Sequence, residues 1–221
     1  MNIPELIKEH HQAMIDKGFY ICPECKGNET LEGYPDNDCK TCHGSGIDPN
    51  KNIGELLMLI VTELSEALEA HRNNNFCTFN RSHHLNIDNL LPPGIGESEF
   101  NGLSVYQECF EYDIKDIFED ELTDTRLRLF DFCGYLNIKP NYQNVKTKSL
   151  VFTDNVGENI GKISKLVLSF NIDITNRVAW MNYILNSLDV FCEKYNIPIE
   201  KHILAKIVYN KTRPHKHGKE Y

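Results

Sequence analysis

The sequence predicts an all-α protein, because apolar residues recur at helical spacing in several long segments. Two of these segments, 52–73 and 114–137, carry strong amphipathic patterns. Three more, at 156–170, 175–195 and 199–211, also favour helices. The chain has 221 residues and is 41% hydrophobic, which is enough for a packed core. We therefore expect one large helical domain, with room for a small added module.

The first fifty residues divide into a short helix and a segment of different composition. Residues 3–17 favour a helix that stops at Gly18. Residues 19–47 are rich in Cys, Gly, Asp and Asn and show no helical period. Asp48-Pro49-Asn50 then offers a turn and a helix start. The expected organisation is an N-terminal helix at 1–18, a module at 19–47, and a helical domain at 48–221.

Two segments have the clearest helical patterns. The apolar residues of the first are Ile53, Leu56, Leu57, Ile60, Val61, Leu64 and Leu68. Those of the second are Ile117, Phe118, Leu122, Leu127, Leu129, Phe130 and Cys133, and Lys139-Pro140 ends it. Between them, residues 74–113 read as one long irregular connection, of a length that usually carries function or moves. Residues 139–155 read as a linker.

A faint internal repeat relates the two halves of this domain. Asn52-Ile53-Gly54 recurs as Asn159-Ile160-Gly161, and the pair Phe132-Cys133 with Asn137-Ile138 recurs as Phe191-Cys192 with Asn196-Ile197. Each half would be a helical hairpin, and two hairpins would make a four-helix bundle. The second hairpin, within 156–211, would be degenerate, because Trp180 and Tyr183 fall where Glu121 and Asp124 would be. Matches this short also arise by chance.

The charge of the chain limits its partners. A net charge of −9 argues against a polynucleotide-binding face, which needs positive charge over a large surface. It is compatible with a single nucleotide whose phosphates are carried by metal ions. No stretch approaches the roughly 20 apolar residues that span a bilayer, and the charged N-terminus lacks the apolar core of a signal peptide. We therefore expect no membrane partner and a cytoplasmic location.

Four of the eight cysteines form two Cys-x-x-Cys pairs, Cys22 with Cys25 and Cys39 with Cys42. Each pair can hold one side of a tetrahedral Zn²⁺. Glycines two residues past each pair allow the tight turn that follows. A redox dithiol is the alternative, although no βαβ pattern accompanies it. The segment between the pairs holds too little apolar material to fold unaided, so we predict a structural zinc knuckle.

Four carboxylates form the candidate catalytic site. Glu63 and Glu66 lie three residues apart on the first strong helix, and Glu121 and Asp124 do so on the second. Residues three apart share a helix face, so antiparallel packing would bring all four together. Such a cluster repels itself unless cations fill it, and hard oxygen ligands suit Mg²⁺, or Mn²⁺ in its place. For either pair alone, a solvated helix face is the competing interpretation.

The C-terminus adds a group of basic and amide side chains. Lys206, Asn210, Lys211 and Arg213 lie at the end of the last predicted helix. Arg can hold phosphate oxygens in a bidentate way, and Lys acts as a point charge. A frayed basic tail is the alternative.

These motifs together resemble the MazG-like branch of the all-α nucleoside triphosphate pyrophosphohydrolases. The similarity runs along 59–70, along 118–124, and along the tail 209–219, which looks like the ending of phage and bacterial members. It covers 52–138 and 196–219 well, and 74–113 and 139–195 poorly. The family often has two acidic residues before the x-x-Glu of its first motif, whereas the first of them is Thr62 here, and this leaves the number of metal ions open.

The resemblance implies a bundle that hydrolyses a ribo- or deoxynucleoside triphosphate to the monophosphate and pyrophosphate. By position, Glu63, Glu66, Glu121 and Asp124 would bind Mg²⁺ and carry catalysis, and Lys206, Asn210, Lys211 and Arg213 would contact the substrate phosphates. It also implies a homodimer, unless the second hairpin of the same chain replaces a partner. The competing hypothesis is a non-catalytic adaptor, in which the zinc knuckle and the helical scaffold bind another protein.

Overall fold

The computed structural model describes residues 2–27, 39–77, 99–141, 148–171 and 176–218, and this part of the chain is all-helical. The α-helices are α1 (Ile3–Asp16), α2 (Ile53–Arg72), α4 (Glu99–Asp113), α5 (Phe118–Tyr135), α6 (Val156–Leu168), α7 (Arg177–Lys194) and α8 (Ile199–Thr212), followed by the 3₁₀ helix η2 (His215–Gly218). The only regular pairing outside helices in the described residues is a bridge between Ile21 and Ile47. The all-α prediction is therefore confirmed.

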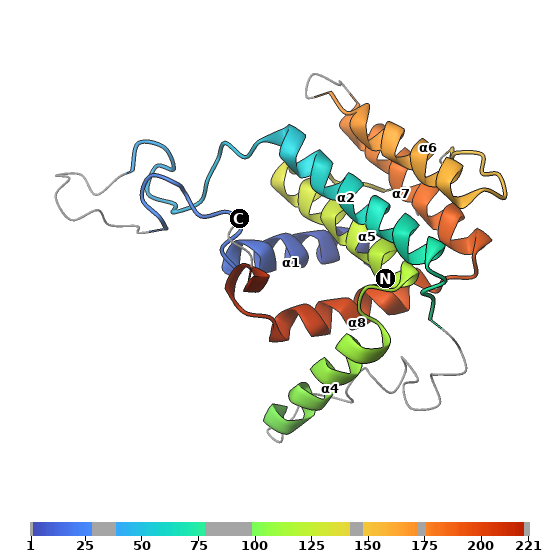
Figure 1. The fold of residues 1–221 in the computed structure, drawn as a ribbon. Helices are drawn as coiled ribbons and strands as arrows, with labels where there is room; N and C mark the ends of the chain where they lie inside the picture. Colours follow the sequence, from blue (N-terminus) through green and yellow to red (C-terminus); the bar gives the residue numbers. More distant parts are fainter. Residues whose placement is uncertain (1, 28–38, 78–98, 142–147, 172–175, 219–221) are drawn as a thin grey trace.

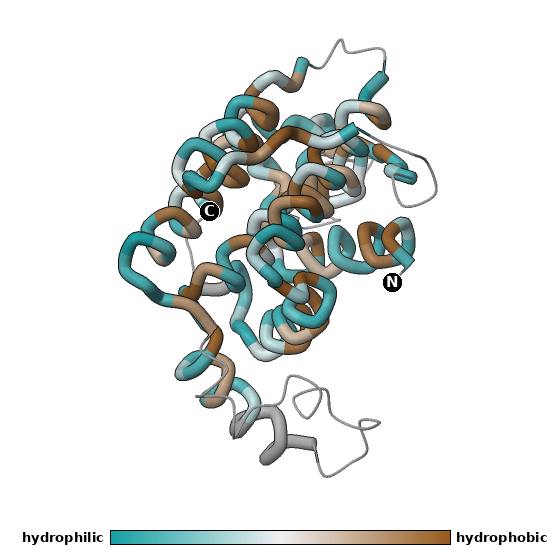
Figure 2. Tube along the Cα trace, turned by 90° about the vertical axis from the view of Figure 1, so that its right-hand side faces the viewer, coloured by the Kyte–Doolittle hydropathy of each residue, from teal (hydrophilic) through white to brown (hydrophobic). Residues whose placement is uncertain are grey.

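The helices pack around α5, which contacts α1, α2, α7 and α8 (Figure 1). Helix α6 packs against both α2 and α7, so α2, α5, α6 and α7 share one core. Hydrophobic and hydrophilic residues are interspersed along the coloured helical segments, as expected when one face of a helix is buried (Figure 2). None of the helices in the described part of the chain combines the length and the apolar character needed to cross a membrane.

Helix α4 corrects the expectation of an irregular connection over 74–113. Its last two turns pack Tyr106 and Phe110 against Ala205 and Tyr209 of α8, which forms a second, smaller core. The helix otherwise stands away from the body of the molecule (Figures 1 and 2). Its amphipathic pattern is weak, and its stability depends on contacts with α8 that the local sequence does not reveal. Residues 78–98 of the expected connection lie outside the described residues.

Helix α5 begins at Phe118 rather than at residue 114. Asp116 adopts a left-handed conformation with φ 64°, which interrupts the helical backbone. The Asp116 backbone N–H donates to the Asp120 carboxylate over 3.1 Å, and the Asp116 carbonyl accepts from the Asn75 side chain over 2.8 Å. This turn fixes the start of α5 against the end of α2.

The C-terminal ends of α5 and α7 have the same local structure. Asn137 and Asn196 are both left-handed, with φ of 52° and 56°. The following Ile138 and Ile197 donate backbone hydrogen bonds to Cys133 and Cys192 over 2.8 and 2.9 Å. Helices commonly end in this way, with an Asn or Gly in the left-handed region. The Phe-Cys and Asn-Ile part of the repeat therefore marks two equivalent helix ends.

The N-terminal ends of α2 and α6 give a different register from the one that the sequence suggests. Asn52 caps α2 by accepting from the Glu55 N–H over 3.0 Å, and Asn155 caps α6 by accepting from the Glu158 N–H over 2.8 Å. Asn52 thus corresponds to Asn155. Asn159 instead lies fully buried inside α6.

Candidate metal and nucleotide site

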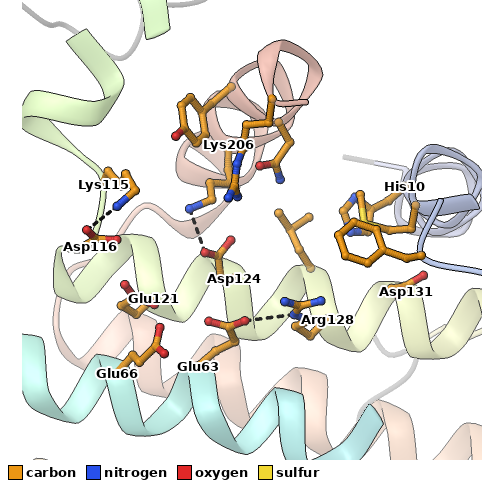
Figure 3. A pocket seen from close by; sticks show the side chains of 16 residues that line it. His10, Glu63, Glu66, Lys115, Asp116, Glu121, Asp124, Arg128, Asp131 and Lys206 are labelled. Carbon is orange, nitrogen blue, oxygen red and sulfur yellow. Dashed lines mark hydrogen bonds and ion pairs between the residues drawn. The ribbon is translucent and has the colours of Figure 1, made fainter. Parts of the chain in front are cut away.

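The four predicted carboxylates meet between α2 and α5, the two helices that pack most closely (Figure 3). Oxygen atoms of Glu63, Glu121 and Asp124 lie within 4.8 Å of one another. Glu66 lies beside them, exposed, with its carboxylate directed toward Glu121. Glu63 and Glu121 are only 8% and 5% exposed. The two motifs therefore converge on one place and are not two solvated faces.

Burial and mutual repulsion dominate the electrostatics of this cluster. Burial, together with repulsion from the neighbouring Asp124, Asp120, Glu66 and Glu63 carboxylates, raises the pKa of Glu121 to about 9. Burial and Asp124 also raise the pKa of Glu63, while Arg128 opposes them. The Glu121 carboxylate has no hydrogen-bond or ion-pair partner among the described side chains. A divalent cation would relieve this repulsion and satisfy the buried oxygens.

A cavity of about 200 Å³ opens over the carboxylates. Seven of the eight residues predicted to bind Mg²⁺ or the substrate phosphates line it: Glu63, Glu66, Glu121, Asp124, Lys206, Asn210 and Arg213. Lys211 does not line the cavity and is exposed. The cavity wall thus combines carboxylates from α2 and α5 with basic and amide groups from α8.

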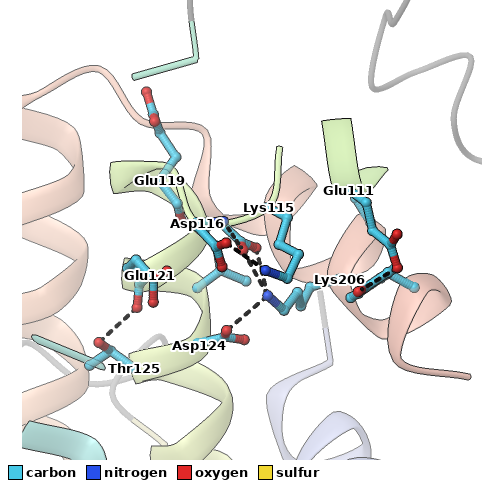
Figure 4. A network of polar contacts seen from close by, with 12 residues as sticks. Glu111, Lys115, Asp116, Glu119, Glu121, Asp124, Thr125 and Lys206 are labelled. Atoms are coloured by element: carbon cyan, nitrogen blue, oxygen red, sulfur yellow. Dashed lines mark hydrogen bonds and ion pairs between the residues drawn. The ribbon is translucent and has the colours of Figure 1, made fainter. Parts of the chain in front are cut away.

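Lys206 lies deeper than a phosphate ligand would be expected to lie. Its ammonium group contacts both oxygens of Asp120, at 2.9 and 2.8 Å, and one oxygen of Asp124, at 2.8 Å (Figure 4). Burial acts to lower the pKa of Lys206, but the Asp124 and Asp120 carboxylates outweigh it and raise that pKa. Asp120 is a site residue that the sequence leaves ambiguous within the acidic run 119–121.

Arg128 is a second residue that sequence reasoning overlooks. It lies one turn after Asp124 on α5 and donates from Nε to the Glu63 carboxylate over 3.0 Å. Arg128 follows Asp124 by four residues, so the two share a helix face, and this spacing is the feature of the sequence that could have identified it. The ion pair fixes Glu63 across the interface between α2 and α5.

The opposite wall of the cavity comes from α1 and the residue that follows its turn. His10, Met14 and Phe19 line it, together with Leu127 of α5. His10 is 8% exposed, and burial lowers its pKa, so the imidazole is neutral near pH 7. No sequence motif marks this wall, because it forms only when α1 packs across α5.

Contacts at the end of α1 bring the C-terminal tail to the site. Gly18 has φ +85°, and a Cβ at this position would collide with the His215 ring. The Lys216 backbone N–H donates to the Lys17 carbonyl over 2.8 Å, and the Lys17 ammonium donates to the Arg213 carbonyl. The tail is therefore held at Arg213 and beyond, which argues against a frayed end for residues 213–216.

The four cysteines of the two Cys-x-x-Cys pairs form a buried cluster, with all sulfur atoms within 4.8 Å of one another. Cys22 and Cys39 sulfurs are 3.8 Å apart, and Cys25 and Cys42 sulfurs are 3.6 Å apart. Zn–S bonds of about 2.3 Å in a tetrahedron place the sulfurs about 3.8 Å apart, so the donor set fits Zn²⁺. Each pair is followed by a turn of the same type. Two successive residues have positive φ in each turn, Lys26 and Gly27 in the first and His43 and Gly44 in the second.

The base of this cysteine module contacts the cavity wall. The Cys22 backbone N–H donates to the Gly46 carbonyl over 2.8 Å, and the Asp48 backbone N–H donates to the Tyr20 carbonyl over 2.7 Å. Tyr20 in turn donates its hydroxyl to Asp131 of α5 over 2.8 Å. Phe19, which lines the cavity, is thus held between α1 and the cysteine module.

We expect the purified protein to hold about one zinc ion per chain, because four buried thiolates without a cation would repel one another. A Cys25→Ser variant should lose the ion and become more sensitive to proteolysis within 19–47. Metal analysis and limited proteolysis measure both effects. Cys109→Ser, outside the cluster, should keep its zinc. A zinc-free wild-type protein with an intact module would favour the redox alternative.

No protein-family model, curated protein or solved structure gives a significant match to this chain.

Proposed function

We propose that this chain is a Mg²⁺-dependent nucleoside triphosphate pyrophosphohydrolase of the MazG-like all-α family that its motifs resemble. It hydrolyses a ribo- or deoxynucleoside triphosphate to the monophosphate and pyrophosphate. The observation that carries the proposal is the convergence of Glu63, Glu121 and Asp124 within 4.8 Å, in a cavity that basic side chains also line. Carboxylates beside cations in one cavity suit a metal-bound polyphosphate.

Glu63, Glu121 and Asp124 would hold the divalent cation, with Glu66 beside them. When bound, Mg²⁺ neutralises the triphosphate, orients the α-phosphorus and lowers the pKa of a coordinated water. Hydrolysis needs a base for the attacking water. Glu63 is engaged with Arg128, whereas Glu66 is exposed and has no described partner. Glu66 is therefore better suited than Glu63 to act as the base.

The phosphates would lie on the α8 side of the cavity. Arg213 and Asn210 line this side, and the Asn210 side-chain NH₂ can donate to a phosphate oxygen. The Arg213 guanidinium lies over the Tyr209 ring, 5.7 Å from its centroid, which holds it near the cavity. A guanidinium in this place can bind phosphate oxygens in a bidentate way.

The nucleoside would lie on the α1 side. Met14, Phe19 and Leu127 offer an apolar surface, and the neutral His10 imidazole offers one donor and one acceptor. Sites for small organic molecules commonly combine an apolar lining with a few polar groups that fix orientation.

The α6–α7 hairpin would take the place of a partner subunit's hairpin in a four-helix bundle. Two observations support this: its helix ends match those of α2 and α5, and it packs on both of those helices. Trp180 corresponds to Glu121 and packs against Phe170, with ring centroids 4.8 Å apart, so the second position is filled by aromatic packing. The protein would then be active as a pseudo-dimeric monomer, and an obligate dimer in sedimentation would count against this.

The test is release of pyrophosphate from a panel of ribo- and deoxynucleoside triphosphates with Mg²⁺. Wild-type protein should release pyrophosphate, and the rates should rank the substrates. Glu66→Gln should lower the rate by about 100-fold or more, since a positioned acid or base contributes about 10²–10⁴-fold. Glu193→Gln removes an exposed carboxylate on α7 and should leave the rate unchanged. A folded, zinc-loaded wild type that releases no pyrophosphate would favour the adaptor hypothesis.

A further inference from the structure

A second group of carboxylates adjoins the proposed metal site. Oxygen atoms of Asp116, Asp120 and Glu121 also lie within 4.8 Å of one another, so the two groups share Glu121. Adjacent carboxylate groups with a shared member are the arrangement that binds two metal ions about 4 Å apart in many phosphate-processing enzymes. The site therefore contains enough carboxylates for either one divalent cation or two.

A cation, the ammonium of Lys206, already lies between the two groups. It contacts Asp120 of the second group, with Oδ1 at 2.9 Å and Oδ2 at 2.8 Å, and Asp124 Oδ2 of the first group at 2.8 Å. An ammonium has three N–H donors, and these three contacts use all of them. The Lys206 and Asp120 side chains are only 4% and 2% exposed. A buried ion pair is stable only when each charge lies beside an opposite charge, and here the Lys206 ammonium lies against the Asp120 carboxylate.

Aromatic side chains hold Lys206 in this position. Its ammonium lies 5.4 Å from the centroid of the Phe110 ring and 5.8 Å from that of the Tyr209 ring. The two rings stack on each other with centroids 4.3 Å apart. Tyr106 also donates its hydroxyl to the Ala205 carbonyl over 2.6 Å, which fastens α4 to α8 beside the lysine. Lys206 cannot leave the carboxylates without disrupting this second core.

We infer that the Lys206 ammonium takes the place of a second divalent cation, so that the site binds a single ion through Glu63, Glu121 and Asp124. Lys206 is then a positioning residue: it neutralises Asp120 and holds Asp124 by one oxygen, leaving the other for the metal. Phosphate binding falls to Arg213 and Asn210, because the Lys206 donors are already used. This inference rests on the proposed function only for the identity of the substrate.

Manganese binding to the full-length, zinc-loaded protein tests the inference without any substrate. Electron paramagnetic resonance should count about one Mn²⁺ per chain, with the six-line spectrum of an isolated ion and no spin coupling. Two bound ions with a coupled spectrum in the wild type would overturn the inference. This measurement stands by itself if the variants below do not fold.

Three variants sharpen the test. Lys206→Met leaves Asp120 and Asp124 without their cation and should raise the number of bound Mn²⁺ to about two. Lys206→Met with Asp120→Asn should return it to about one, because the second set of ligands is then incomplete. Lys211→Met removes an exposed lysine from the same helix and should leave the number of bound Mn²⁺ at about one. A folded Lys206→Met variant that binds no additional ion would also overturn the inference.

The two proposals can fail separately. Pyrophosphate release with two ions bound would contradict the role of Lys206 and leave the proposed function intact. A single bound Mn²⁺ without any triphosphate hydrolysis would support the role of Lys206 and contradict the proposed function.

Discussion

Replacing Glu121 with glutamine is expected to abolish triphosphate hydrolysis and, at the same time, to stabilise the metal-free protein. The loss of activity should be at least about 100-fold, the scale that follows from disturbing a metal site. The gain in stability has a separate cause, because the variant removes a buried carboxylate that four other carboxylates repel. Together the two opposite effects distinguish a metal ligand from a residue needed for folding.

The direction of the pH effect follows from the pKa of Glu121. Its ordinary pKa is 4.5, and in the folded protein it rises to about 9. Between these values the folded state binds the extra proton, so the stability of the metal-free wild type falls as pH rises through this window. Glu121→Gln should therefore raise the free energy of unfolding at pH 8 by at least about 1 kcal/mol, since one pKa unit corresponds to about 1.4 kcal/mol.

Thermal unfolding of the zinc-loaded protein from pH 5 to 9, in buffer without Mg²⁺ or with added Mg²⁺, measures this behaviour. Mg²⁺ should stabilise the wild type more strongly at high pH, because binding displaces the proton. Glu193→Gln serves as the matched control and should follow the wild type. A metal-free Glu121→Gln variant that is less stable than the wild type at pH 8 would contradict the electrostatic account.

Replacing Asp189 with asparagine should give the largest loss of stability away from the site. Asp189 of α7 forms an ion pair with Arg126 of α5, whose side chain is 1% exposed. A second contact joins Arg126 Nη2 to Asp189 Oδ2 over 3.4 Å. Removing one partner leaves a buried charge without compensation, which costs about 3 kcal/mol or more. The midpoint of thermal unfolding should fall by about 6–12 °C.

Asp154→Asn is the matched control for this variant. It removes the carboxylate of another ion pair to α7, with Lys194, but Asp154 is fully exposed. Solvent screening makes such a pair weak, so the midpoint should not change measurably. Equal losses in the two variants would show that the Arg126 pair is no stronger than a surface contact. Metal binding should remain intact in both, because neither residue lines the cavity.

The sequence predicts most helices correctly because their buried apolar residues recur with the period of a helix. α1, α2, α6, α7 and α8 begin and end within a few residues of the predicted positions. The start of α5 differs because the left-handed Asp116 depends on a hydrogen bond from the Asn75 side chain and on one that its own N–H donates to Asp120. Helix α4 was missed for a related reason, since its apolar residues Tyr106 and Phe110 pack on α8, about a hundred residues away.

The candidate site divides in the same way. Glu63, Glu66, Glu121 and Asp124 could be predicted from spacing within single helices, and the structure brings them together. The contact between Lys206 and Asp120 could not, because it joins residues on α8 and α5 that share no motif. The α1 wall with His10 and Phe19 likewise results from packing between distant segments. Local patterns therefore identify ligands, whereas the walls of the cavity require the fold.

The most direct test of the proposed chemistry is the identity of the products from a single triphosphate. Phosphorus NMR of a reaction with Mg²⁺ and the best substrate of the panel resolves the alternatives in one spectrum. The proposed function predicts that signals of the nucleoside monophosphate and of pyrophosphate grow together at equal rates, and that neither grows with Glu121→Gln. Formation of the diphosphate and inorganic phosphate, or an unchanged triphosphate with folded wild-type protein, would contradict it.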